Sequence, residues 1–165
     1  MNEALLMELQ QEAKTTRTVL ERVPADHLTW KPHHKSMSLG QLAMHIARLP
    51  GAMSRISQLP EFDVSNANSE PPQPASTDEF LAAFDQGLAD ATACVRGLTP
   101  ESAMAPWRLV LGEKELFQIP RAAMLRTLLY NHLIHHRGQL SVYLRLLDVP
   151  VPIIYGSSAD EKPLQ

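Results

Sequence analysis

The strongest constraint on the fold of this chain is a set of apolar side chains that recur at helical spacing in four separate segments. Within each segment they follow one another at intervals of three and four residues, which places them on one face of an α-helix. The last segment runs from about Pro120 to Leu147, and a helix of ~28 residues would measure ~42 Å. Because a helix with one apolar face must bury that face, four such segments predict a helical bundle.

The first two segments have recognisable limits. Residues 2–22 predict the first helix. The second begins at Ser38, which has with Gln41 the spacing of a capping box, in which each side chain satisfies the free amide of the other residue. Pro50 removes a bond from the ladder of this second helix, so we expect a kink directly after His45.

A polar, proline-rich stretch separates the second helix from the third. Between Pro60 and Pro74 the sequence has no hydrophobic period, which predicts a long loop. Loops of this length often have a function. Ser76 and Glu79 have the spacing of a second capping box, at the start of the third helix.

The segment between the third and fourth helices has a mixed pattern. Thr99-Pro-Glu predicts a short helical turn, and the residues from Trp107 favour a brief extended piece that turns at Gly112. We find no convincing ladder of strands. The sequence therefore predicts an all-α protein: an antiparallel four-helix bundle, formed by residues 1–165 as a single domain, with a long loop between helices two and three.

Composition narrows the classes of partner and compartment. The net charge is −3 and there is no basic cluster of the kind that neutralises phosphates, so we expect no nucleic-acid partner. No apolar run reaches ~18 residues, and Met1-Asn-Glu-Ala lacks the start of a secretory signal, so we expect no membrane partner. A single cysteine, Cys94, fits a reducing, cytoplasmic compartment and cannot build a thiolate cage for a metal.

Three histidines predict a metal site. His132 and His136 lie one turn apart on one face of the fourth helix, and β-carbons at this spacing are ~5–6 Å apart. Two such imidazoles can bind one ion through ring nitrogens ~2.0–2.1 Å from it. His45, on the predominantly apolar second helix, offers a third imidazole. Three protein ligands leave a position for water or substrate, as in a catalytic site.

Two further side chains continue the face of the histidine pair. Gln139 and Tyr143 could donate hydrogen bonds to a group bound there, so we expect them at the mouth of a cavity. A second interpretation stays open, in which His45 is a hydrogen-bonded core residue and the pair is an exposed one. Gly138 lies mid-helix and costs about 1 kcal/mol relative to alanine, which favours the close approach of a neighbouring helix.

The segments that carry the histidines resemble the signatures of a known family. Residues 132–147, His-Leu-Ile-His-His-Arg-Gly-Gln-Leu-Ser-Val-Tyr-Leu-Arg-Leu-Leu, resemble the C-terminal signature of the DinB/YfiT-like proteins, a family of proposed metal-dependent enzymes. Trp30-Lys-Pro and Ser38-Leu-Gly-Gln-Leu-Ala-Met-His45-Ile-Ala are similar to the N-terminal signature, and Val151-Pro-Ile-Ile-Tyr-Gly resembles the closing segment. The resemblance covers nearly the whole chain.

The resemblance implies a fold, a cofactor and a chemistry. Members are four-helix bundles, commonly homodimers, that bind nickel, zinc or other divalent ions through three histidines corresponding to His45, His132 and His136. Because relatives include thiol-dependent S-transferases, we expect a metal-dependent enzyme that uses a low-molecular-weight thiol to attack a small electrophile. Two alternatives stay open: a metal-dependent hydrolase, and a non-enzymatic, stress-related dimer that binds metal or a small ligand.

Overall fold

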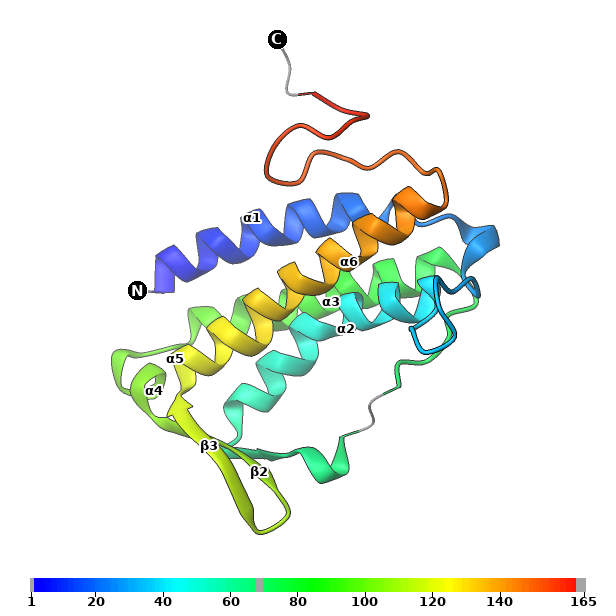
Figure 1. Ribbon diagram of the computed structural model, residues 1–165. Helices are drawn as coiled ribbons and strands as arrows, with labels where there is room; N and C mark the ends of the chain where they lie inside the picture. The colour runs from blue at the N-terminus through cyan, green and yellow to red at the C-terminus, as the bar shows by residue number, and fades with distance from the viewer. Residues whose placement is uncertain (1, 68–69, 163–165) are drawn as a thin grey trace.

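Helices form most of the protein. The structure, a computed structural model, describes residues 2–67 and 70–162. Four long helices lie side by side (Figure 1): α1 (Asn2–Leu20), α2 (Leu39–Gln58), α3 (Thr77–Arg96) and α6 (His132–Leu146). Shorter helical segments join them: the 3-10 turns Ala25–His27 and Val64–Asn66, α4 (Pro100–Met104), α5 (Arg121–Met124) and a π-helix (Leu125–Asn131) that continues directly into α6.

A three-stranded sheet lies beside the helices, so the prediction of an all-α protein is wrong in this part. The strands are β1 (Glu61–Asp63), β2 (Pro106–Leu111) and β3 (Lys114–Pro120), with β1 parallel and β3 antiparallel to the central β2. The turn predicted at Gly112 is confirmed, with a φ of 58° that glycine adopts readily. β1 comes from the predicted loop, of which residues 68–69 lie outside the described residues. Three residues are too few to show an alternating pattern.

Consecutive helices α2 and α3 run parallel. The sequence predicted an antiparallel bundle, in which they would run in opposite directions. Gly51 lies against Gly87, and Ser57, further along α2, lies against Cys94, further along α3. Helices α1 and α6 run in the opposite direction (Figure 1). The chain must therefore travel back the length of a helix, ~30 Å for 20 residues, before α3 can begin. Residues 59–76 make this crossover, which explains their length.

Helices α2 and α3 touch through their backbones at a pair of glycines. A β-carbon added to Gly87 would lie 3.0 Å from the backbone nitrogen of Gly51 and 3.4 Å from the carbonyl oxygen of Ala47. A β-carbon added to Gly138 would have no neighbour within 4 Å. The close approach predicted at Gly138 is therefore wrong: that glycine faces open space, and the close approach lies between α2 and α3.

One of the two capping boxes expected from the sequence forms. The Gln41 amide donates to Ser38 Oγ at 3.1 Å, and the Ser38 amide donates to Gln41 Oε1 at 3.0 Å. At the start of α3 the side chain of Ser76 makes no capping bond. Glu79 instead accepts from the amide of Ala75 at 3.2 Å, one residue earlier than the capping box requires. The start of α2 is thus confirmed in detail, and that of α3 only in position.

A buried ion pair joins α6 to α1. Arg137 is 1% exposed and Glu12 is 7% exposed. Arg137 Nη2 lies 2.7 Å from Glu12 Oε2, and Nη1 donates to the Glu12 carbonyl at 3.1 Å and to Thr16 Oγ1 at 3.2 Å. The hydroxyl of Tyr155, from the C-terminal segment, accepts from Arg137 at 2.6 Å and donates to Glu12 at 2.8 Å. Both charges are therefore satisfied inside the protein.

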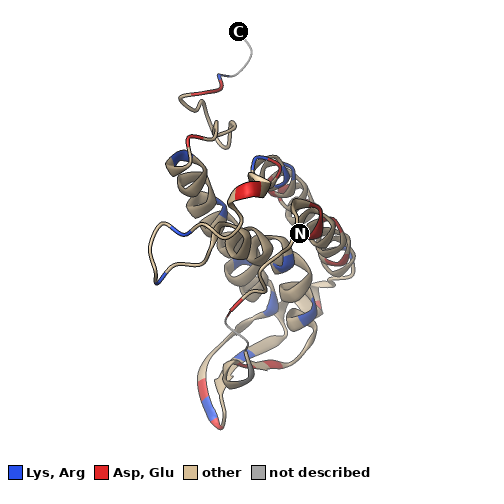
Figure 2. Ribbon diagram, turned by 90° about the vertical axis from the view of Figure 1, so that its right-hand side faces the viewer, with Lys and Arg blue, Asp and Glu red and all other residues tan. Residues whose placement is uncertain are grey.

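Two apolar clusters fill the interior. One lies between the helices and includes Phe80, Phe84 and Leu133, and the other includes Trp107 and Tyr130. The Trp107 indole nitrogen donates to the carbonyl of Ile56 at 3.2 Å, which ties β2 to the end of α2. Charged residues of both signs are distributed over the helices and the hairpin (Figure 2). Within the described ranges, no helix combines the length and apolarity needed to cross a bilayer.

The glycine contact predicts opposite effects of two identical substitutions. Gly87→Ala is expected to destabilise the protein by about 1–3 kcal/mol, because the new methyl group pushes the backbones of α2 and α3 apart. Gly138→Ala is expected to stabilise it by about 0.5–1 kcal/mol, because alanine is the better helix former and meets no neighbour. Urea unfolding followed by circular dichroism measures both. Equal changes in the two variants would contradict the contact.

Candidate metal centre

Helix α2 places His45 at the edge of the core, facing α6. Its neighbours Met44 and Ile46 are buried, at 7% and 0% exposure, while His45 itself is half-buried. α2 passes through Pro50 as one helix and ends at Gln58, so the proline does not divide it. His45 therefore stands on a continuous helix, which holds its backbone in place from both sides.

A π-helix precedes the histidine pair on the last helix. Over Leu125–Asn131 the hydrogen bonds join each residue to the fifth one along, so each turn is wider than in an α-helix. Leu125, Leu129, Leu133 and Arg137 are buried at an interval of four through the π-helix and into α6, so one inward face continues across the junction. His132 and His136 each precede a residue of this face by one position, so the pair lies beside it.

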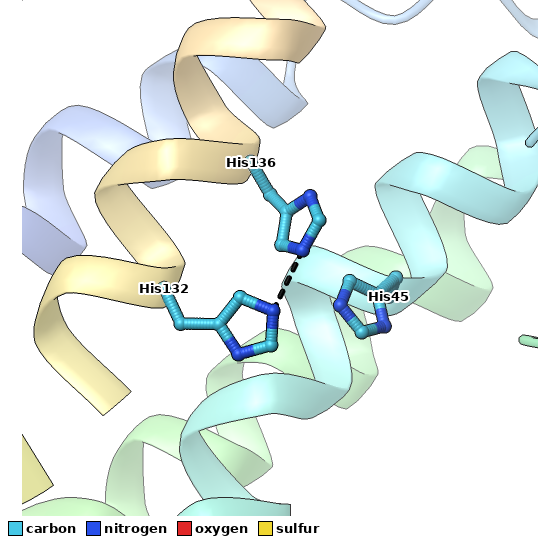
Figure 3. Close-up of side chains that lie close together, drawn as sticks. All are labelled: His45, His132 and His136. Carbon is cyan, nitrogen blue, oxygen red and sulfur yellow. Dashed lines mark hydrogen bonds between the residues drawn. The ribbon is translucent and has the colours of Figure 1, made fainter. Parts of the chain in front are cut away.

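Three imidazoles converge between α2 and α6 (Figure 3). The Nε2 atoms of His132 and His136 are 2.7 Å apart. The ring centre of His45 lies 4.4 Å from that of His136 and 5.3 Å from that of His132. One ring nitrogen from each residue lies within 4.8 Å of the others. The structure thus brings together the three histidines that the sequence singled out.

A hydrogen bond outside the cluster orients the ring of His136. Nδ1 of His136 donates to Gln139 Oε1 at 2.7 Å, which leaves a lone pair on its Nε2. A hydrogen bond joins this Nε2 to Nε2 of His132 at 2.7 Å (Figure 3). The two nitrogens are thus directed at one point, where a metal ion can take the place of the shared proton, so the donor set fits a metal ion.

Burial favours the neutral form of these imidazoles. Desolvation, with repulsion from His136 and His132, lowers the pKa of His45 to about 4. Desolvation also lowers the pKa of His132 and that of His136. Interaction with the Leu128 backbone raises the pKa of His132, and the hydrogen bond to Gln139 raises that of His136, but desolvation is the larger effect. The neutral imidazole is the form that binds a metal, so the three rings are ready for one at neutral pH.

A cavity of about 480 Å³ adjoins the cluster and is lined by His45 and His132. Its other walls come from α2, from β1 and from the crossover between α2 and α3. A second cavity, of about 610 Å³, lies between the ends of α2 and α3 around Cys94 and shares no lining residue with the first. The larger cavity contains no group of metal ligands among the described residues, so the smaller one is the candidate site.

The two other side chains named from the sequence make contacts of their own. Gln139 is exposed and reaches back to His136. The Tyr143 hydroxyl donates to the carbonyl of Met37 at 3.3 Å, and its ring meets Trp30 edge-on with centres 5.7 Å apart. Their role in orienting a bound group stays a prediction. The orienting part of Gln139 was missed from the sequence, although its place three residues after His136 could have indicated it.

The lowered pKa values predict a stability that falls with acidification. Above about pH 6.5 His45 is neutral in both states, and between pH 6.5 and about 4 it binds a proton mainly in the unfolded chain. The lowered pKa values of His132 and His136 act in the same direction. Stability of metal-free protein is therefore expected to decrease over this range. His45→Asn should make the decrease shallower, and His34→Asn, on an exposed loop, should leave it unchanged. Calorimetry of chelator-treated protein at several pH values measures the stability. An equal change of stability with pH in the two variants would contradict the prediction.

Comparison with known proteins agrees with the fold. The model of the DinB family matches residues 1–163. The crystal structure of a DinB-like protein from Bacillus cereus is similar with a TM-score of 0.72 and 21% identity, over 93% of this chain and 97% of that one. That of a DinB-like protein from Bacillus subtilis has a TM-score of 0.69 and 20% identity, over 92% and 97%. No curated protein matches the sequence. The match over nearly the whole chain shows that this protein belongs to the DinB family.

Proposed function

We propose that this protein is a metal-dependent enzyme that activates a low-molecular-weight thiol for attack on a small electrophile. The observation that carries the proposal is the convergence of three imidazoles at one end of a cavity. His45, His132 and His136 would hold a divalent ion, nickel or zinc, and three protein ligands leave coordination positions for other molecules. A structural site is usually closed by four ligands.

The cation, two side chains and the cavity would each contribute to the reaction. When bound, a divalent cation favours the deprotonated, nucleophilic form of a thiol. Gln139 holds the ring of His136 with its Nε2 toward the cluster. Tyr143, two turns after His136, is proposed to orient a bound group with its hydroxyl. The cavity of about 480 Å³ beside His45 and His132 has the room for a small molecule.

We also propose that α1, α2, α3 and α6 form a four-helix bundle that acts as a homodimer in the cytoplasm. Contacts join α1 to α3, α3 to α2, α2 to α6 and α6 to α1, which supports a closed ring of four helices. The dimer follows from the resemblance to the family, and the compartment from the single cysteine.

The metal site predicts the metal content of purified variants. Protein prepared without an affinity tag is expected to contain a divalent ion, and His136→Ala is expected to lose it. His135→Ala is the matched control, because His135 is exposed on the same helix and outside the cluster. Gln139→Ala should weaken metal binding by about 10–100-fold, as loss of a group that orients a ligand does. Elemental analysis and metal titration measure these effects. An equal metal content in His136→Ala and wild type would show that this cluster does not bind the metal.

The thiol chemistry predicts a transfer reaction that needs both metal and thiol. Wild type and His135→Ala should couple a small thiol to a fluorogenic electrophile such as monochlorobimane. Chelator-treated protein and His136→Ala should fall to the background rate, because they lack the charge that favours the thiolate. Fluorescence over a panel of thiols measures the rate. Metal-loaded protein that transfers none of them would support the non-enzymatic alternative, in which the ion stabilises the fold.

A further inference from the structure

The cavity beside the histidines has an apolar wall that metal binding does not use. The wall is formed by side chains of α2 and of β1: Leu49, Ala52, Met53, Ile56 and Phe62. Ala67, Pro71 and Pro72, from the crossover between α2 and α3, also line the cavity. Two charged residues, Arg48 and Glu70, complete the lining. A mainly apolar cavity with a few charged groups is typical of a site for an organic ligand.

The cavity extends along α2 from the imidazoles. His45, Arg48, Ala52 and Ile56 follow one another at intervals of three and four residues, so they share one face of this helix. At 1.5 Å per residue, the distance along the axis from His45 to Ile56 is about 16 Å. Arg48 is the first of these residues after His45. A charged group therefore lies next to the metal ligands, and the apolar part of the cavity lies beyond it.

Arg48 is the charged group of the cavity without a partner. It is exposed, and within residues 2–67 and 70–162 it forms no hydrogen bond or ion pair. By contrast, Glu70 accepts a hydrogen bond from Gln41 Nε2 at 3.1 Å. Arg55, two turns further along α2, lies 3.4 Å from Asp90. A guanidinium offers a planar pair of donors that matches the two oxygens of a carboxylate.

We propose that this cavity binds an amphipathic carboxylate, with its carboxylate on Arg48 and its apolar tail along Ala52, Met53 and Ile56 toward Phe62. This deepens the proposed function and rests on it, since it names the class of electrophile that the site receives. The carboxylate lies next to the histidines, so the reactive carbon of such a substrate is close to its carboxylate. Burial of the tail against the wall supplies apolar contact, and the ion pair supplies orientation.

Calorimetric titration of the full chain as purified, at low salt and about pH 8, tests the assignment. The probes are 4-phenylbutyrate and its neutral amide. Wild type is expected to prefer the carboxylate by about tenfold. Arg48→Gln should abolish this preference, and Arg48→Lys, which keeps the charge, should retain part of it. Arg55→Gln removes the same charge from the same helix, outside the cavity, and should change nothing. Met53→Ala should weaken both probes by the same factor.

Three results would overturn the inference. They are binding of neither probe, a preference that survives Arg48→Gln, and an equal loss in Arg55→Gln. Metal content is measured on the same samples, and the titration is repeated after dialysis against a chelator. A preference that depends on the metal and not on Arg48 would overturn the inference and leave the proposed function standing. A preference that depends on Arg48, in protein that takes up no metal, would support this binding site and contradict the proposed metal-dependent function.

Discussion

The buried ion pair between Arg137 and Glu12 determines how the last helix is turned against the rest of the protein. Removing one partner from such a pair leaves an uncompensated buried charge, at a cost of about 3–5 kcal/mol, so α6 cannot rotate away from α1. His136 precedes Arg137, and successive side chains on a helix differ in direction by ~100°. With Arg137 directed at α1, His136 is directed at α2, where His45 lies. The orientation of the candidate metal ligands therefore depends on a contact outside their site.

The direction of the helices explains the cavity. Because α2 and α3 run parallel, with Gly51 against Gly87, the chain between them has to return along the bundle. This return supplies Phe62 from β1 and Pro71 and Pro72 from the segment that follows, all of which line the cavity beside the histidines. A connection required by topology thus becomes the outer wall of the candidate site, as long loops on a rigid scaffold often do.

The parts of the fold that the sequence predicted are those with local causes. Helical periodicity located the four long helices, and the capping box located the start of α2 at Ser38, because both depend on residues within one or two turns. The sheet was missed because β1 has three residues and pairs through its backbone with a strand more than 40 positions away. The π-helix was missed because its buried residues Leu125 and Leu129 keep an interval of four, which an α-helix also shows.

By itself, the sequence determined which residues can bind a metal: a histidine pair one turn apart, and a lone histidine on an apolar helix, are properties of composition and spacing. Only the tertiary structure decided that the three rings meet and that Gln139 orients one of them. It also decided that Arg48, among the described residues, lies unpaired beside an apolar cavity. The physical reason is that these relations join α2 to α6 or to the crossover. Such contacts depend on the directions and rotations of whole helices, which packing and one buried ion pair set.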